Sequence, residues 1–252
     1  MLDNFVWQAI STEQSALGVV GPRGLAGRFP AEVSPFCGLA EASAEAWEDL
    51  ASVLGTADVA ILMGPPVDET PKGWTCLLEE VATQWVAGET DAPSPRFEFA
   101  PLGADDVPDM LDLTARTEPG PFLPSTIRFG RYWGVRRGGK LVAMAGERMR
   151  AGGCVEISAV CVDPSAQREG LGAAASLFVA ERIREEGGLP ILHVRQGNDP
   201  ALALYARIGF TRRTDRFVYV LAPPGWAPPD EDPGWLASDA PARPEKEEVP
   251  ET

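Results

Sequence analysis

Two glycines stand where a strand-like segment gives way to a helix-like one, and their position suits the binding of an anion. In residues 155–162 apolar side chains alternate with others and β-branched residues are dense, which favours a strand. Apolar residues then recur at helical spacing from Leu171 until the glycine pair at 187–188. Gly170 and Gly172 therefore lie where the first N–H groups of a helix are unpaired and no side chain keeps a phosphate away.

Two common phosphate-binding loops do not fit this stretch. A P-loop needs Lys followed by Ser or Thr after its last glycine, and Ala173-Ala174 stand there instead. A Rossmann loop carries a third glycine, which is missing here. The segment QREGLG at 167–172 instead resembles the Q/R-x-x-G-x-G/A pyrophosphate loop of the GNAT superfamily of acetyl-CoA-dependent N-acyltransferases.

The resemblance extends beyond the loop, to the segment ILHVRQGNDPALALYARIGF at 191–210. It is similar to the family's succession of strand, Asn, helix and Gly-Phe turn, with Asn198, Tyr205 and Gly209-Phe210 at the matching positions. The resemblance covers about half of the chain, from near Phe97 to near Leu221. It implies an α/β fold with a mixed sheet. The chain has a smaller α/β half before the GNAT-like half, and this layout is similar to that of the glycine N-acyltransferase-like branch.

The resemblance also implies that acetyl-CoA is the cosubstrate. With four cysteines that form no CxxC pair and a single histidine, no metal is expected. The residues that the resemblance assigns to acetyl-CoA are Val160, Cys161, Val162, Gln167, Arg168, Glu169, Gly170, Leu171, Gly172, Ala173 and Asn198. Among them, the strand residues would offer main-chain groups to the pantetheine arm. Asn198 has two alternatives, which are to orient the cofactor or to cap the helix that begins near Pro200.

N-acyl transfer from a thioester needs an uncharged amine, a stabilised oxyanion and a proton for the departing thiolate. Glu156 matches a strand position where several GNAT enzymes carry a catalytic glutamate, so we expect it to be the base; the alternative is an ordinary solvated glutamate. Glu147, on the preceding strand, is the reserve candidate. Tyr205 is expected to protonate the thiolate, and the alternative is a packing role on its helix.

Three further side chains are weighed for the acceptor side of the site. Cys161 would suit an acyl-enzyme mechanism, but a buried cysteine in an apolar strand is usually inert, so we expect direct transfer. His193 is either a core or surface histidine or part of the acceptor pocket. Phe122, in the loop 118–124, is a candidate for the wall of that pocket.

The net charge of −15 is distributed unevenly along the 252 residues. Residues 1–95 hold 14 acidic and 3 basic side chains and residues 222–252 hold 8 and 2, whereas residues 96–221 hold 15 and 17. The basic residues thus accompany the phosphate loop, which suits an anionic cofactor. The acidic flanks disfavour nucleic-acid binding and favour a cationic small amine as acceptor.

These patterns predict three parts. Residues 1–95 form a small α/β half, with strands over 16–20 and 59–63, a helix from Ser43 and another from Thr75. Residues 96–221 form the GNAT-like half, after a linker at 91–95. The proline-rich acidic tail from 222 to 252 is expected to be disordered.

Within the GNAT-like half, antiparallel strands are expected to come first. The patterns predict a strand at 97–99, a helix over 105–116, and strands over 132–136 and 140–150. Gly138-Gly139 would supply the positive φ angles of the tight hairpin between the last two.

The expected function is transfer of an acetyl group from acetyl-CoA to a primary amine of a small or amino-acid-like molecule, in a ternary complex. One alternative is a catalytically silent acyl-CoA-binding or regulatory protein, and another is a structural module whose acidic half binds a partner. No apolar run long enough for a membrane span and no paired CxxC cysteines occur, so we expect a cytoplasmic protein without a structural zinc site. Whether it is a monomer or a homodimer stays open.

Overall fold

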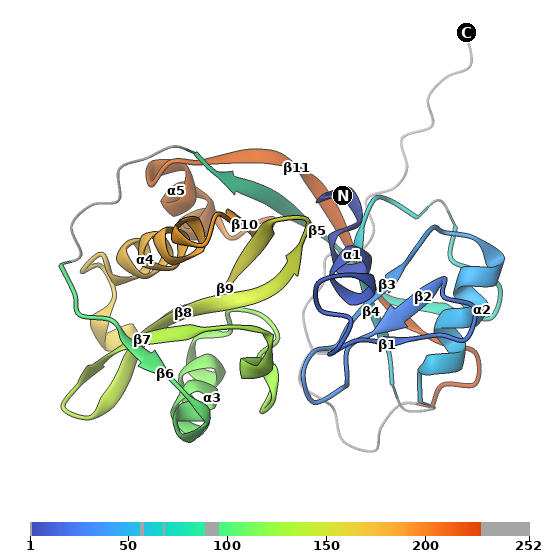
Figure 1. The fold of residues 1–252 in the computed structure, drawn as a ribbon, viewed down its shortest axis with the longest axis horizontal. Helices are drawn as coiled ribbons and strands as arrows, with labels where there is room; N and C mark the ends of the chain where they lie inside the picture. Colours follow the sequence, from blue (N-terminus) through green and yellow to red (C-terminus); the bar gives the residue numbers. More distant parts are fainter. Residues whose placement is uncertain (1, 56–57, 68, 89–95, 228–252) are drawn as a thin grey trace, which may run out of the picture.

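One mixed sheet of eleven strands runs through the described chain, which comprises residues 2–55, 58–67, 69–88 and 96–227 of a computed structural model (Figure 1). The strands lie in the order β1-β2-β3-β4-β11-β5-β10-β9-β8-β7-β6. Their bounds are β1 Val19–Val20, β2 Ala26–Arg28, β3 Phe36–Leu39, β4 Ala60–Gly64, β5 Thr75–Ala87, β6 Ala100–Leu102, β7 Tyr132–Arg137, β8 Lys140–Ala151, β9 Cys154–Val162, β10 Leu189–Arg195 and β11 Phe210–Ala222. The predicted α/β fold with a mixed sheet is confirmed.

The helices are distributed over both faces of this sheet. They are α1 Phe5–Ser11, α2 Ala44–Val53, α3 Val107–Thr117, α4 Leu171–Glu185 and α5 Asp199–Arg207, with short 3-10 turns at Leu2–Asn4, Ala104–Asp106, Thr126–Phe129 and Pro164–Ala166. Figure 1 shows α4 and α5 on one side of the strands β7 to β10 and α3 on the other. Helix α1 packs on both β3 and β8, so it connects the two halves of the sheet. No helix in the described ranges is both long and apolar enough to cross a bilayer.

Strand β5 corrects one prediction, because a helix was expected from Thr75. Leu77, Leu78, Val81 and Trp85 do recur at helical spacing, yet the segment is a strand of thirteen residues between β10 and β11. Leu77 and Leu78 pack against one apolar cluster and Trp85 lies in another. A strand that buries residues in different clusters loses the simple alternation by which strands are recognised.

The other predicted elements of the GNAT-like half are largely confirmed. The hairpin of β7 and β8 turns at Gly138 and Gly139, whose φ angles are +56° and +84°. The strand expected at 97–99 is wrong, since β6 begins at Ala100. Pro101 has no N–H, which suits an edge strand such as β6, whereas Phe99 stacks on Phe178 of α4 with 4.9 Å between ring centroids.

The two predicted halves share one sheet, because β5 of the first half lies between β11 and β10 of the second. It pairs with β11 over twelve residue pairs and with β10 over five. The linker at 91–95 and the tail beyond residue 227 lie outside the described residues. The boundary at residue 95 and the disorder of the tail stay predictions.

A chain reduced to residues 96–252 should lose cooperative unfolding. Without β5, strands β10 and β11 each lose a partner in the middle of the sheet, and their exposed apolar edges favour aggregation. Scanning calorimetry of this chain beside the full chain checks the expectation, and removal of residues 228–252 is the control with an intact sheet. A sharp transition in the 96–252 chain at the full chain's melting temperature would show that β5 is dispensable.

Candidate active site

Strands β9 and β10 run side by side at their start and then part. Their parallel pairing ends at the pair Glu156 and Ile191, beyond which β9 stays paired with β8 and β10 with β5. Ala159 has a φ of +52°, and the pairing of β8 with β9 shifts register around it. Such a bulge bends a strand. Within the described residues, the main chain of 157–162 therefore has no strand partner on the side of β10, which is the divergence that the family resemblance implies.

The loop after β9 leads to the solvent-exposed beginning of α4. Gln167 and Glu169 are exposed, and so are Arg168 and Gly170, whose φ angles are +65° and +91°. Gly170 directly precedes Leu171, the first helical residue, so the N–H groups of the first turn have no partner within the helix. Main-chain N–H groups that converge at a helix start bind phosphate well. The loop therefore has the geometry of an anion-binding site.

The entry to this loop is held by a buried carboxylate. Asp163 accepts hydrogen bonds from the backbone N–H and hydroxyl of Ser165 at 2.9 and 2.6 Å, and it pairs with Lys140 at 2.9 Å and with Arg116. The hydrogen bonds from Ser165, with those from Lys140 and Arg116, hold the pKa of this carboxyl well below its usual range. Its negative charge is thus neutralised locally, close to where an anionic ligand would bind.

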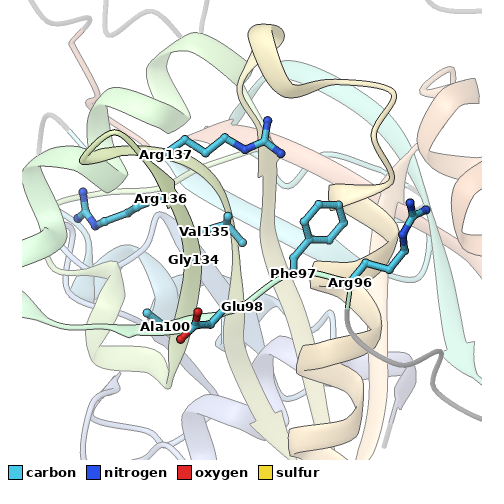
Figure 2. Close-up of a pocket in the computed structure, with 8 residues that line it drawn as sticks. All are labelled: Arg96, Phe97, Glu98, Ala100, Gly134, Val135, Arg136 and Arg137. Atoms are coloured by element: carbon cyan, nitrogen blue, oxygen red, sulfur yellow. The ribbon is translucent and has the colours of Figure 1, made fainter.

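A shallow hollow of about 420 Å³ lies on the β6 and β7 side of the loop. It is lined by Arg96, Phe97, Glu98, Ala100, Gly134, Val135, Arg136 and Arg137 (Figure 2). Figure 2 shows Arg136 and Arg137 extending away from each other. Arg137 forms a two-fold ion pair with Glu169, at 2.9 and 2.5 Å, and so ties the hollow to the loop.

Tyr205 of α5 is buried in the apolar cluster beneath α4. Its phenol is hydrogen-bonded to Ser176, and the Ser176 hydroxyl in turn donates to the carbonyl of Gly172 at 2.8 Å. Burial raises the pKa of Tyr205 to about 12, although the Ser176 hydrogen bond lowers it in part. The phenol therefore keeps its proton at neutral pH and is linked to the start of α4.

The structure also shows the surroundings of Cys161 and Asn198. Cys161 is 1% exposed, and burial raises the pKa of its thiol to about 12, so the thiolate needed for nucleophilic attack is scarce. The Asn198 side chain accepts a hydrogen bond from the backbone N–H of Ala201 at 3.2 Å. Of the two alternatives for Asn198, the capping contact is thus present in the structure.

Glu156 is a fully buried carboxylate with three charge-assisted hydrogen bonds. Arg148 donates from Nε to Oε2 at 2.8 Å and from Nη2 to Oε1 at 2.6 Å, and His193 Nδ1 lies 2.7 Å from Oε1. Burial alone would raise the pKa of Glu156, but the charge and hydrogen bonds of Arg148, together with His193, lower it to about 2. Glu156 is therefore an anion at any pH used for an assay.

The reserve candidate Glu147 is not brought together with Glu156. It is paired in register with Ile157, which packs against α4, and successive strand residues point to opposite faces. Glu147 is also buried, and it pairs with Arg131 at 2.6 Å and with Arg150 at 2.5 Å. It serves a separate charge cluster near the end of α4.

On the face of α3, Phe122 packs edge to face on Tyr132, with 5.6 Å between ring centroids. Tyr132 is 1% exposed, and within the described residues its hydroxyl has no hydrogen-bond partner. Burial raises the pKa of that phenol, and the charges of Arg148 and Glu156 act on it from nearby. Tyr132 therefore carries a donor that a bound polar group could satisfy.

Sequence reasoning missed Arg148, Tyr132 and Ser176. For Arg148 a signal existed, since three charged residues at 147, 148 and 150 interrupt an otherwise apolar strand. Its guanidinium also lies over the ring of Phe36, at 4.8 Å from the centroid, so the first half of the chain covers it. In the described ranges no three His, Cys, Asp or Glu side chains are grouped as metal ligands would be.

Known proteins resemble this chain in sequence and in structure. A family model described as FR47-like protein matches residues 132–219. Mycothiol acetyltransferase of Thermomonospora curvata is 38% identical over 117 residues, which are 46% of this chain and 37% of that protein. N-alpha-acetyltransferase RimI of Mycobacterium tuberculosis is 40% identical over 85 residues, which are 32% of this chain and 52% of that protein. The chain thus spans between a third and about half of the length of these curated relatives.

A solved structure extends the likeness to nearly the whole fold. A GNAT-family protein from Novosphingobium aromaticivorans is 35% identical, with a TM-score of 0.79, and the match covers 88% of this chain and 98% of that one. A GCN5-related N-acetyltransferase from Kribbella flavida has the same fold at 20% identity, with a TM-score of 0.56 and coverage of 84% and 95%. Because the first match combines high identity with nearly complete coverage, this chain belongs to the GNAT family.

Proposed function

We propose that this protein is an acetyl-CoA-dependent N-acetyltransferase that acts on a primary amine by direct transfer. Membership of the GNAT family supports the proposal, as do the acetyltransferase names of the relatives. The observation that carries it is the occurrence of three features near the carboxyl ends of the parallel strands β9 and β10. These are the gap between β9 and β10, the exposed start of α4 and the buried phenol of Tyr205.

Acetyl-CoA fits the residues near the carboxyl ends of these two strands. The main chain of 167–173 would hold the diphosphate, and the free edge of 160–162 would hold the pantetheine arm. Gly170 suits this role because its φ of +91° is strained for other residues, and no atom lies within 4 Å of where a Cβ would stand. Bound acetyl-CoA supplies the activated acyl thioester.

Tyr205 is the proposed donor to the departing sulfur. Its phenol is hydrogen-bonded to Ser176, and this hydrogen bond would be exchanged for one to the sulfur when the phenol donates. The raised pKa keeps the proton in place until negative charge develops nearby. Cys161 is not needed in this scheme, because the amine attacks the thioester directly.

Glu156 is the proposed proton acceptor, but its lowered pKa makes it a weak base. A carboxylate with a pKa of about 2 lies about eight units below an alkylammonium ion of pKa about 10, so it cannot deprotonate the free acceptor. It can take the proton as the tetrahedral intermediate collapses and the thiolate leaves, because the nitrogen of the resulting N-protonated amide is strongly acidic. We therefore propose that the acceptor binds as the neutral amine.

The acceptor is proposed to be a small molecule or an amino-acid-like compound. Phe122 and the free hydroxyl of Tyr132 would line its pocket on the face of α3, beside Arg148. The acidic first half favours the approach of a cationic amine from solution, which loses its proton before it binds at the reaction site. A place in the glycine N-acyltransferase-like branch stays a prediction. A cytoplasmic location also stays a prediction, and the four described cysteines, which form no disulfide, are compatible with it.

Tyr205→Phe should lower turnover by about 10² to 10⁴ while acetyl-CoA binding barely changes. The ring packing against Phe210 is retained and only the proton is lost. Steady-state rates with an amine panel, together with calorimetric titration of acetyl-CoA, measure both quantities. Cys161→Ala is the control and should keep most of its activity; an acetyl group trapped on Cys161 would overturn direct transfer.

Glu156→Gln should slow the reaction by roughly 10²-fold, by a factor that does not depend on pH. Because the pKa of Glu156 is about 2, the acid limb of the rate profile reports the protonation of the acceptor in both proteins. Rates of the two proteins with amines of different pKa, measured from mildly acidic to alkaline pH, test this. A deficit that disappears as the pH rises would show that Glu156 deprotonates the ammonium form.

A further inference from the structure

A continuous row of polar side chains runs from the first residues of the chain to Glu156. Arg213 Nη1 lies 2.9 Å from Asp3 Oδ1 and 2.8 Å from Gln84 Oε1. Gln84 Nε2 lies 2.9 Å from His193 Nε2, and His193 Nδ1 lies 2.7 Å from Glu156 Oε1. Gln84 and Glu156 are fully buried and the His193 side chain is 4% exposed, so few of these contacts can be exchanged for water.

The partners of Gln84 determine which way its amide points. Arg213 can only donate, so the amide atom that faces it must be the carbonyl oxygen. The backbone carbonyl of Leu2 can only accept, and it lies 3.1 Å from the amide nitrogen. Both contacts require the same orientation, in which the NH₂ group of Gln84 faces His193.

This orientation determines the state of the imidazole. Because the amide NH₂ donates to Nε2 of His193, that nitrogen must carry a lone pair and no proton. The ring proton of the neutral histidine then lies on Nδ1, from which it donates to the carboxylate of Glu156.

We propose that Gln84 is a positioning residue, which locks His193 as the Nδ1–H tautomer and through it orients Glu156. The three side chains lie on neighbouring strands, since β5 pairs with β10 and Gln84 stands opposite His193 in the register. Residues 1–95 therefore contribute to the site of the second half not only the strand β5 but also the side chain of Gln84. The expected effect on turnover rests on the proposed function of Glu156. The assignment of the His193 tautomer does not depend on that function.

His193 is the only histidine of the chain, so its ring nitrogens can be observed without assignment. Long-range ¹H–¹⁵N correlation spectra of the full chain, labelled with ¹⁵N-histidine and recorded near neutral pH, show which nitrogen carries the proton. We expect protonated Nδ1 and unprotonated Nε2 in the wild type. In Gln84→Glu the side chain can accept but no longer donate, so Nε2 should become protonated.

Kinetics of the same variants test the positioning role. Gln84→Glu should lower kcat by about tenfold or more without changing the KM for acetyl-CoA, since the partner of Glu156 is altered and the cofactor loop is not. Gln8→Glu, on α1, makes the same change of charge and should alter neither the spectrum nor the rates.

The outcomes separate the two claims. A proton on Nε2 in the wild type, whether in the other neutral tautomer or in the imidazolium, overturns the lock. An altered spectrum with unchanged kcat in Gln84→Glu overturns the positioning role. A wild type with the expected spectrum but no turnover on any amine would contradict the proposed function and leave the lock intact.

Discussion

The gap between β9 and β10 can exist only because each strand is held from its outer side. A strand that leaves its neighbour within a sheet exposes a row of N–H and C=O groups, which is costly unless the other edge is paired or a ligand binds. Here β8 holds β9 beyond Glu156, and β5 holds β10 beyond Ile191. Since β5 belongs to the first hundred residues, the opening of the proposed cofactor site depends on a strand that lies far from it in the sequence.

The same arrangement explains how a charged cluster can be buried beneath the site. Glu156 would be unstable alone in this position, but Arg148 compensates its charge and His193 lies within hydrogen-bond distance of it. Arg148 in turn is covered by Phe36 and His193 is held by Gln84, both from the first half of the chain. That half therefore acts on the chemistry through contacts with the second half, although it has no phosphate loop of its own.

The elements that local patterns specify were predictable, and those that depend on distant partners were not. Residues 155–162, the helix after Gly170 and the Gly138-Gly139 hairpin have clear strand, helix and turn signals, and the structure has each of them. The segment 75–87 has apolar residues at helical spacing, which predicts a helix, yet it is a strand that buries residues in two apolar clusters. The contact of Glu156 with Arg148, eight residues earlier, follows from the antiparallel pairing of the consecutive strands β8 and β9. Nothing local in the sequence relates Glu156 to Gln84, because that link depends on a strand order in which β5 of the first half lies beside β10.

We propose that acetyl-CoA binds where β9 and β10 part and where α4 begins. Hydrogen exchange of the full chain, recorded by mass spectrometry with and without acetyl-CoA, can locate the bound cofactor, and Gly170→Glu is the variant that places a side chain and a negative charge in the loop. We expect slower exchange in the peptides that contain 157–162 and 167–174 of the wild type, and no such change in the variant. Unchanged exchange in those peptides at saturating acetyl-CoA, or protection confined to another part of the sheet, would contradict it.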